Sequence, residues 1–384
     1  MRKLLVGLSA CLCTAALWGQ GIVFEPMSWQ QALDKARAEG KWVFLDAYTT
    51  WCGPCKTMSA RTFPDSAVGA FFHSRFVSIQ VDMEAGEGPK LAERYQVSLY
   101  PTLLFIQPDG VLAHRAVGYL TPKPFLETAR AATDTATNML ALRTRYERGE
   151  HDPALLLALA RIYSAAYDRR TAQVASEYFA TQPDLNSPEN QAAIMDFADD
   201  PYSLAFKHFV QNLPQFEARF GAEQVAQKQD AVFETYMEEH PSLQLGEVQR
   251  LYATCYPQQG ARLASNYRLS YYQEHEEWAS FVQAAQEHVR YYAAQNPDEL
   301  QEIASLFAQH ISDAAQLELA IGWAQQSVAL QECSANQHTL AQLLQKVGKK
   351  KAALKAARRA LDLARQAGED TASMLQLIED LGGK

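Results

Sequence analysis

The sequence predicts an α/β domain in the first third of the chain, a sheet flanked by helices, with an all-α region after it. The run 41–48 is apolar on both faces, which is typical of a central strand, and 76–82 predicts a second central strand. Segments with helical spacing separate these runs. From residue 133 onward the pattern is helical almost throughout, and prolines divide it into segments of helix length.

Each element of the first third has its own signals. Ser28 is suited to N-cap a helix that Gly40 ends, and Pro108-Asp109-Gly110 predicts the turn of a hairpin. The expected order is a helix to Gly40, a strand at 41–48, a helix from Pro54, a helix from Asp65 or Ser66, a strand at 76–82, a helix from 87 to 95, strands at 102–106 and 111–116, and a helix from 121 to about 132.

Residues 1–20 have the pattern of an export signal. A charged start at Met1-Arg2-Lys3 precedes an apolar run at 4–18, which is short for a membrane span. We therefore expect a cleaved signal peptide and a location outside the cytoplasm, in the bacterial periplasm. Lipidation at Cys11 is the alternative, because Leu8-Ser9-Ala10-Cys11 matches the letters of a lipobox, and only this alternative would attach the chain to a membrane.

The segment Trp51-Cys52-Gly53-Pro54-Cys55-Lys56 follows the first strand directly. Two cysteines with two residues between them can close a small disulfide ring at the start of a helix, and Pro54 is suited to the first helical turn. Free backbone N–H groups and the positive helix end favour the thiolate of Cys52 over the thiol. Because the thiolate is the reactive species, this arrangement indicates redox chemistry.

This segment and its surroundings resemble thioredoxin. Asp46 lies six residues before Cys52, Tyr100-Pro101-Thr102 precedes an apolar run, and Gly118 falls between the last strand and the last helix. The resemblance covers about residues 22–132. It implies the thioredoxin fold with a central mixed sheet, a cis bond before Pro101, an exposed nucleophile at Cys52, and a second thiol at Cys55 that resolves the mixed disulfide.

Two other interpretations of the cysteine pair are a permanent structural disulfide and half of a zinc site. A structural zinc site normally needs four ligands, and neither a second CxxC nor a nearby His pair is present, so no metal is expected. No diffusible cofactor is expected, because the two sulfurs carry the electrons.

Asp46 is expected to act as a catalytic base, because an Asp within an apolar strand violates the local pattern and a buried carboxylate has a raised pKa. It would take the proton of Cys55, through water, when that thiol attacks. The alternative is an Asp that simply faces water. The basic partner that the family has for this acid is missing, since the strand 77–81 contains no Lys.

Residues around the cysteines are expected to bind the substrate. Trp51 would shield the sulfur, Gly53-Pro54 is the spacer of reducing members of the family, and Tyr100 would expose its backbone to an extended substrate segment beside Pro101. An ordinary trans bond at Pro101 is the alternative that the residues alone favour.

In the helical region, Ala308, Ala320 and Ser327 recur 33 residues later as Ala341, Ala353 and Ala360. This spacing of small residues resembles that of tetratricopeptide repeats, where helices cross closely. We expect a linker or connecting helix at 133–149 and a repeat-like domain at 150–384. The aromatic residues of 252–292 are expected in its core, with a peptide groove as the alternative; they are Tyr252, Tyr256, Tyr267, Tyr271, Tyr272, Trp278, Phe281, Tyr291 and Tyr292.

Together these features predict an exported thiol–disulfide oxidoreductase that reduces or isomerises protein disulfides through Cys52 and Cys55. Its partners would be client proteins with disulfides and a membrane thiol electron donor. The net charge of −9, without any basic block, gives no reason to expect nucleic acid. The alternatives are a disulfide-forming oxidase and a helical-repeat adaptor in which the CxxC only tethers clients.

Overall fold

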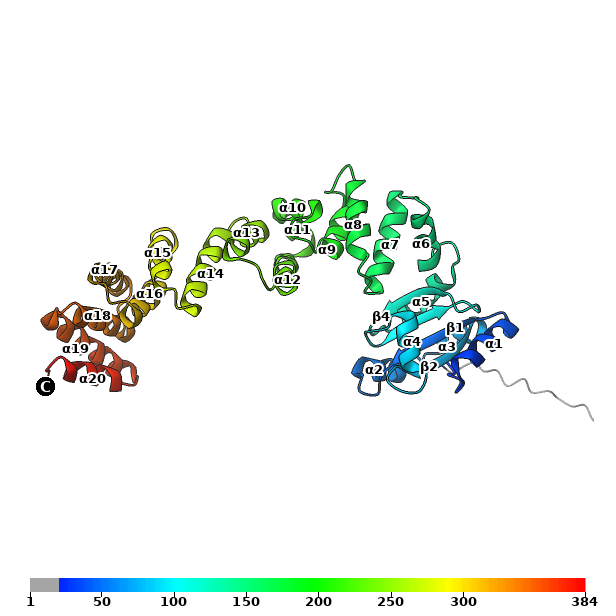
Figure 1. Cartoon of the computed structure of the whole chain (residues 1–384), viewed down its shortest axis with the longest axis horizontal. Coiled ribbons are helices and arrows are strands. Elements are labelled where there is room, and N and C mark those ends of the chain that lie inside the picture. Colours follow the sequence, from blue (N-terminus) through cyan, green and yellow to red (C-terminus); the bar gives the residue numbers. More distant parts are fainter. Residues whose placement is uncertain (1–20, 384) are drawn as a thin grey trace, which may run out of the picture. The chain divides into compact units, whose positions relative to one another are not determined.

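The structure is a computed structural model that describes residues 21–383. The expectations for the signal peptide and for Cys11 lie outside these residues. The chain divides into two compact units, the first reaching Asp199 and also containing Ser203–Ala205, the second consisting of Asp200–Tyr202 and the residues from Phe206 onward. Figure 1 labels most of the helices and strands of both units. Between residues 21 and 383, no helix combines the length and the apolar character needed to cross a membrane.

The first unit begins with helix α1 (Trp29–Glu39), whose ends are those the sequence predicts. The Ser28 hydroxyl accepts a hydrogen bond from the backbone N–H of Gln31, and Gly40 ends the helix with a φ of 65°. Only glycine adopts this left-handed conformation without a steric cost. Trp29 and three smaller apolar residues of α1 are buried against the sheet.

The sheet has four strands in the order β2-β1-β3-β4. They are β1 (Trp42–Tyr48), β2 (Phe76–Asp82), β3 (Thr102–Ile106) and β4 (Leu112–Val117). β1 pairs parallel with β2 and antiparallel with β3, and β3 forms an antiparallel hairpin with β4. The result is the mixed sheet that the resemblance implies.

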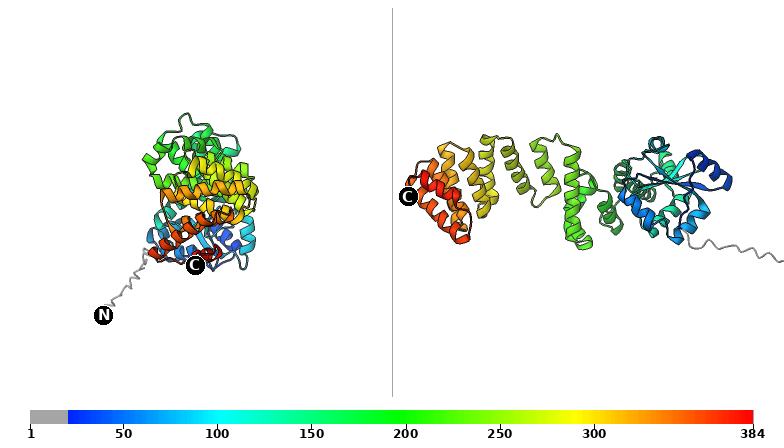
Figure 2. Two further views of the ribbon diagram at one scale, coloured as in Figure 1. Left: turned by 90° about the vertical axis from the view of Figure 1, so that its left-hand side faces the viewer. Right: turned by 90° about the horizontal axis from the view of Figure 1, so that it is seen from below.

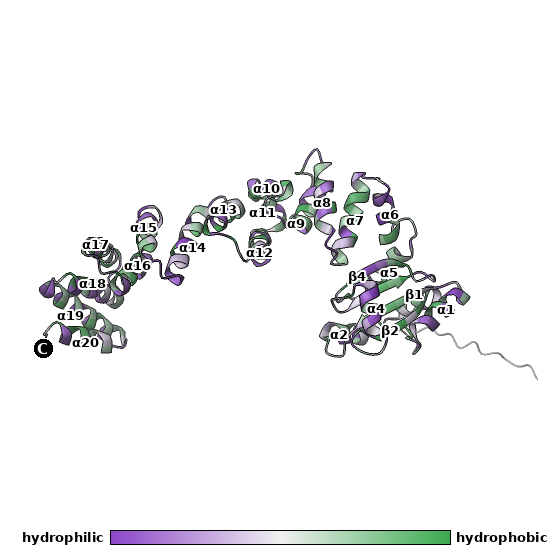
Figure 3. Ribbon diagram, viewed as in Figure 1, coloured by the Kyte–Doolittle hydropathy of each residue, from purple (hydrophilic) through white to green (hydrophobic). Residues whose placement is uncertain are grey.

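Helices cover both faces of this sheet (Figure 2, right). They are α1 on one face with α4 (Gly88–Tyr95), and α2 (Gly53–Arg61), α3 (Ser66–Arg75) and α5 (Pro122–Thr133) on the other. Successive residues of a strand point to opposite faces, so Leu45 packs toward α1 and α4, whereas Phe44 packs toward α2, α3 and α5. Hydrophobic residues accordingly dominate the strands in Figure 3.

β2 is an edge strand, so the prediction of a second central strand at 76–82 is wrong. On its outer side it has only an isolated bridge, between Ser78 and Phe24. Its first four residues are nevertheless buried, because α1 packs on one face and α3 on the other. Burial of both faces therefore reports the covering helices and does not determine a strand's position in the sheet.

The first unit continues beyond the sheet with four helices. They are α6 (Met139–Glu147), α7 (Pro153–Ala165), α8 (Thr171–Ala180) and α9 (Pro188–Phe197). Both α6 and α7 pack against β4, and α6 also packs against α7. These contacts join the first helices to the α/β domain, and the compact unit ends at Asp199, later than the domain boundary predicted at residue 150.

The rest of the chain is helical, as predicted. Its elements are α10 (Leu204–Gln211), α11 (Leu213–Phe220), α12 (Ala222–Glu239), α13 (Leu245–Cys255), α14 (Gly260–Glu274), α15 (Trp278–His288), the π-helix η1 (Val289–Ala293), α16 (Pro297–His310), α17 (Ala314–Leu330), α18 (Ser334–Lys346), α19 (Lys350–Ala367) and α20 (Ala372–Asp380). Successive helices pack on one another, most extensively in the pairs α16–α17 and α18–α19.

The small residues of the sequence repeat are buried in these two helix pairs. Ala308, Ala320 and Ser327 lie in α16 and α17, and their counterparts lie in α18 and α19. Small side chains allow the axes of two helices to approach closely, which explains their recurrence. The resemblance to tetratricopeptide repeats stays a prediction.

For the aromatic residues of 252–292, the prediction of a core position is confirmed for Phe281, and Tyr272 and Trp278 pack against the same core cluster; the prediction is wrong for Tyr291. Phe281 is fully buried, whereas Tyr291 is exposed and the others are partly buried. Their rings form a chain of contacts, among them Tyr252 with Tyr267 and Tyr267 with Tyr271. The hydroxyl of Tyr256 donates a hydrogen bond of 2.7 Å to Asp230, so its polar end is satisfied while its ring packs on Phe233 and Tyr252.

Candidate redox site

Cys52 is the N-cap of α2, and Cys55 lies in its first turn. The two sulfurs form a disulfide with 5.4 Å between the Cα atoms, so the structure shows the oxidised form of the pair. The backbone N–H of Cys55 donates to the Cys52 sulfur at 3.1 Å. This N–H and the helix end beyond it would stabilise a negative charge on Cys52 after reduction.

Cys52 is only 2% exposed, so the expectation of an exposed nucleophile is wrong for this oxidised form. Its sulfur turns inward, toward Cys55 and the N–H groups of the helix. Gly53 and Pro54, in contrast, are exposed and form the outer surface of the motif.

The peptide bond between Tyr100 and Pro101 is cis. Pro101 directly precedes β3, in which Thr102 pairs with Ala47 near the end of β1. The loop to Cys52 begins just after that end, and the Cys52 N–H donates to the carbonyl of Thr49. The strand register therefore places the Pro101 turn at the same end of the sheet as the disulfide.

Trp51 and Tyr100 form an aromatic pair at this end of the sheet. The ring centroids are 5.9 Å apart and the rings meet nearly edge to face. Trp51 is 65% exposed, and its indole N–H donates to both carboxylate oxygens of Glu84, at 3.0 and 3.1 Å. The carboxylate fixes the orientation of a large apolar ring that remains open to solvent.

Glu84 was not predicted from the sequence. It lies two residues beyond the end of β2, and nothing in its local pattern distinguishes it from a solvated acidic residue. Only the pairing of β2 with β1 brings the segment after β2 next to the segment that contains Trp51.

Asp46 is buried, with 1% of its surface exposed, so the alternative in which it faces water is wrong. It lies on the same face of β1 as Phe44, the face that α2 covers. Its Oδ2 atom accepts a hydrogen bond of 2.8 Å from the side chain of Gln80. Its Oδ1 atom is buried and has no hydrogen-bond partner among residues 21–383.

Burial raises the pKa of Asp46 from 3.8 to about 7, and the hydrogen bond from Gln80 opposes the rise. Gln80 pairs directly with Asp46 in the register of β1 and β2. It is the residue of the strand 77–81 that takes the place of the missing basic partner, and it donates a hydrogen bond without supplying a charge. Asp46 is consequently poised to gain or lose a proton near neutral pH.

The other two described cysteines do not pair. Cys255 is buried, Cys333 is partly buried, and both thiols are free. Burial raises the pKa of Cys255 to about 12, so this thiol is unreactive at neutral pH. Across residues 21–383, no group of three or more His, Cys, Asp or Glu side chains is arranged to hold a metal ion.

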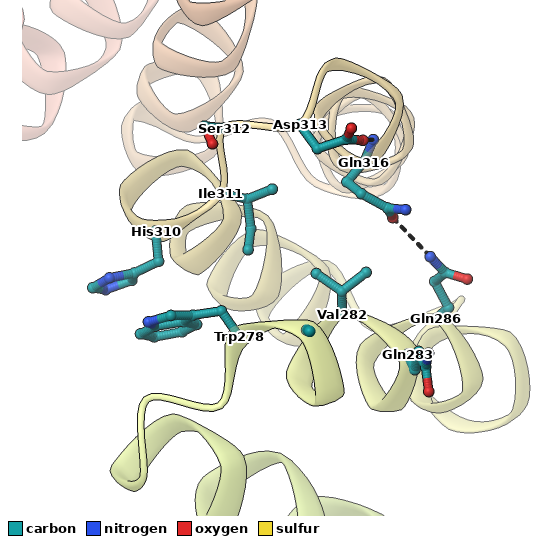
Figure 4. Close-up of a pocket in the computed structure, with 10 residues that line it drawn as sticks. Trp278, Val282, Gln283, Gln286, His310, Ile311, Ser312, Asp313 and Gln316 are labelled. Atoms are coloured by element: carbon teal, nitrogen blue, oxygen red, sulfur yellow. Dashed lines mark hydrogen bonds between the residues drawn. The ribbon is translucent and has the colours of Figure 1, made fainter.

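A separate cavity of about 610 Å³ lies in the second unit, between α15, the end of α16 and the start of α17 (Figure 4). Trp278 and His310 stack there with ring centroids 3.9 Å apart. Gln286 donates to Gln316 across the cavity at 2.9 Å. The cavity and the cysteine pair belong to different compact units of the chain.

Comparison with known proteins agrees with this geometry. Residues 29–133 match the family model for a thioredoxin-like domain. The N-terminal domain belongs to the thioredoxin superfamily. The family to which this domain belongs is one of thiol–disulfide oxidoreductases, and the domain contains the Cys52–Cys55 pair.

Individual relatives match the thioredoxin-like domain alone. The thiol:disulfide interchange protein DsbD of Pseudomonas fluorescens is 37% identical over 108 residues, which is 27% of this chain and 18% of that protein. Thioredoxin-1 of Drosophila melanogaster is 36% identical over 76 residues, 20% of this chain and 66% of that protein. A Bacteroides thetaiotaomicron protein described as a candidate disulphide-isomerase is 41% identical, with 30% of this chain and 97% of that chain covered and a TM-score of 0.29.

Proposed function

We propose that the chain is an exported enzyme that reduces or isomerises disulfides of client proteins through Cys52 and Cys55. The observation that carries this proposal is the disulfide between these residues at the start of α2, in a thioredoxin-like domain. The spacer Gly53-Pro54 resembles that of the reducing members of the family.

The reaction transfers two electrons from the dithiol to the client. The Cys52 thiolate attacks one sulfur of the client disulfide, which gives a mixed disulfide and releases the other client sulfur as a thiolate. Asp46 accepts the proton of Cys55, and the Cys55 thiolate then attacks the Cys52 sulfur. The Cys52–Cys55 disulfide forms, and the client leaves with both of its sulfurs reduced. In an isomerisation, a thiolate of the client resolves the mixed disulfide instead, and the dithiol is regenerated.

The client would bind over the end of the sheet that contains the disulfide. Trp51, with its ring held by Glu84, and the spacer Gly53-Pro54 supply exposed surface there. The backbone of Tyr100, beside the cis bond to Pro101, would pair with an extended client segment. The helical region would retain clients and raise their effective concentration at the thiols.

A second thiol pair must re-reduce Cys52 and Cys55 after each turnover. Several relatives are named thiol:disulfide interchange proteins of bacteria, and these names support exchange with a second thiol pair. In this proposal the donor is a membrane thiol relay, and the enzyme acts in the periplasm. The chain spans only 18% of these relatives, so the match extends to their thioredoxin-like portion and not to their remaining parts.

The proposal is tested by insulin reduction with the wild type, Cys52→Ser and Cys55→Ser. We expect activity in the wild type alone, and accumulation of mixed disulfides with clients in Cys55→Ser, because the resolving thiol is missing. Equal activity of the wild type and a variant that lacks both cysteines would overturn the enzyme proposal and favour an adaptor. The equilibrium of Cys52 and Cys55 with glutathione gives the reduction potential of the pair and so separates a reductase from an oxidase. A reductase has a reduction potential of about −270 mV, and an oxidase has one of about −120 mV.

A further inference from the structure

A cavity of about 310 Å³ in the first unit is lined by arginines from four separate elements. They are Arg94 of α4, Arg115 of β4, Arg143 of α6 and Arg170 just before α8. Asp168 is the one acidic residue of the lining, so the formal charge of the cavity wall is +3. Such a concentration of one sign of charge in a small concave space needs a physical explanation.

Two of these arginines have acidic neighbours. Arg170 forms a two-pronged ion pair with Asp168, through contacts of 2.9 and 2.6 Å. Arg143 lies beside Glu147, but the shortest contact, from its Nε atom, is 3.6 Å and too long for a hydrogen bond. That Nε atom is buried and has no hydrogen-bond partner among the described residues. Asp168 therefore neutralises one guanidinium of the cavity.

The other two arginines have no direct ion pair, although the charge of Asp168 also acts on Arg115 and Arg94 lies over the rings of Trp29 and Tyr95. Neither Arg94 nor Arg115 forms an ion pair with a carboxylate within residues 21–383. Arg115 is partly buried, its Nε atom has no hydrogen-bond partner there, and its one contact to the carbonyl of Gln96 is 3.5 Å long. Burial lowers the pKa of Arg115 because the charged form loses hydration. An unpaired, partly buried guanidinium is costly unless an anion satisfies it.

We propose that this cavity binds a small organic anion with a phosphate or carboxylate group. Guanidinium groups have a planar fork of N–H donors that matches the oxygens of both groups. Leu112, Met139 and the ring of Tyr95 complete the wall and provide apolar surface for the carbon part of the ligand. A volume of about 310 Å³ is at the small end of ligand pockets, so the ligand is of metabolite size.

Binding would strengthen the packing of the helices on the sheet. Arg94 and Arg115 belong to the thioredoxin-like domain, whereas Arg143 and Arg170 belong to the helices that follow it. An anion shared by these groups would connect the two parts, and a ligand that binds only the folded state stabilises it. Neither Cys52 nor Cys55 lines the cavity, so the proposed site is separate from the redox pair. Anion binding there does not depend on the function proposed for that pair.

The test uses the full chain and two probes, inorganic phosphate and citrate, with sodium chloride at matched ionic strength as the reference. Calorimetric titration and thermal unfolding report binding. We expect phosphate or citrate to bind saturably and to raise the melting temperature where chloride does not. Stronger binding of phosphate assigns the site to phosphate groups, and stronger binding of citrate assigns it to carboxylates.

The variant Arg115→Gln/Arg143→Gln should weaken binding by at least about tenfold, because each lost group removes charged hydrogen bonds. The matched control is Arg145→Gln, on the same helix α6, whose side chain pairs with Glu150 and Asp152 outside the cavity. It should bind as the wild type does. Arg94→Gln changes an exposed side chain and provides a second variant if the double variant does not fold.

Two results would overturn the proposal. The first is the absence of saturable binding of both probes up to about 10 mM, beyond the range of weak specific sites. The second is an equal loss of affinity in Arg145→Gln and in the cavity variants, which would show a general effect of charge.

Discussion

The variant Asp46→Asn should stabilise the oxidised thioredoxin-like domain at neutral and alkaline pH. The pKa of Asp46 is raised from 3.8 to about 7 by burial. Between these two pH values the folded state binds a proton that the unfolded state has released, so the free energy of unfolding falls as the pH rises from about 4 to 7. The difference in pKa corresponds to a loss of about 4 kcal/mol, all of it present above pH 7. Asn carries no charge, and its carbonyl oxygen can still accept the hydrogen bond from Gln80.

Hydrogen exchange of β1 peptides, followed by mass spectrometry, measures the opening free energy of this domain separately from the rest of the chain. Wild type and variant are compared at each pH, so the intrinsic pH dependence of exchange cancels. We expect no difference near about pH 4 and a difference that grows to as much as about 4 kcal/mol above pH 7. A difference that stays constant over this range would refute the reasoning, because it would show that Asp46 does not titrate there.

Two changes at Gln80 provide the matched controls. Gln80→Met removes the hydrogen bond that opposes the rise, so the pKa of Asp46 should increase further. Gln80→Lys supplies an opposite charge to the carboxylate, which lowers a neighbouring pKa by about 1 to 3. The pH at which the opening free energy changes should therefore decrease in the order Met, Gln, Lys. A different order would exclude Gln80 as the residue that sets the pKa.

Three further predictions concern other parts of the chain. Burial lowers the pKa of His114 from 6.5 to about 4, so the unfolded state takes up the proton at a higher pH than the folded state does. About 3 kcal/mol of stability should therefore be lost as the pH falls from about 6.5 to 4. His114→Gln should not show this loss in acid unfolding. Ala353→Leu should cost about 1 to 3 kcal/mol in urea unfolding because the site is fully buried, whereas exposed Ala352→Leu should change stability by less than about 0.5 kcal/mol. Trp51→Phe should raise the KM for insulin about threefold to tenfold, because aromatic contact with the client is lost. Glu84→Gln keeps a hydrogen-bond acceptor for the indole and should raise the KM less. An unchanged KM in Trp51→Phe would show that the ring does not contact the client.

The elements of the α/β domain could be predicted because each has a local cause. Ser28 and Gly40 delimit α1, and the short continuous apolar runs of β1 and β3 indicate strands that are buried on both faces. The position of β2 at the sheet edge could not be predicted, because pairing partners are a property of the whole sheet. The burial of Cys52 could not be predicted either, because a position at the start of a helix does not specify which residues cover the side chain.

The surroundings of the candidate sites depended on long-range contacts. The sequence shows that the strand of Gln80 lacks Lys, but only the register of β1 and β2 shows that Gln80 contacts Asp46. The arginine-lined cavity combines residues as distant in the chain as Arg94 and Arg170, and no local pattern relates them. In the helical region, the spacing of apolar residues does not distinguish a fully buried ring from one that packs at the surface.

Both edge strands of the four-stranded sheet have neighbours outside the sheet, although the contact with β2 is short. Helices α6 and α7 pack on β4, and the segment before α1 bridges to β2 through Phe24 and hydrogen-bonds to it through Glu25. Unprotected strand margins invite uncontrolled association with other chains. The bridge at Ser78 interrupts the free backbone of β2, so it shortens the stretch over which another chain could add a strand there. We expect an extended client segment to pair instead with the short backbone stretch at Tyr100, at the end of the sheet that contains the disulfide.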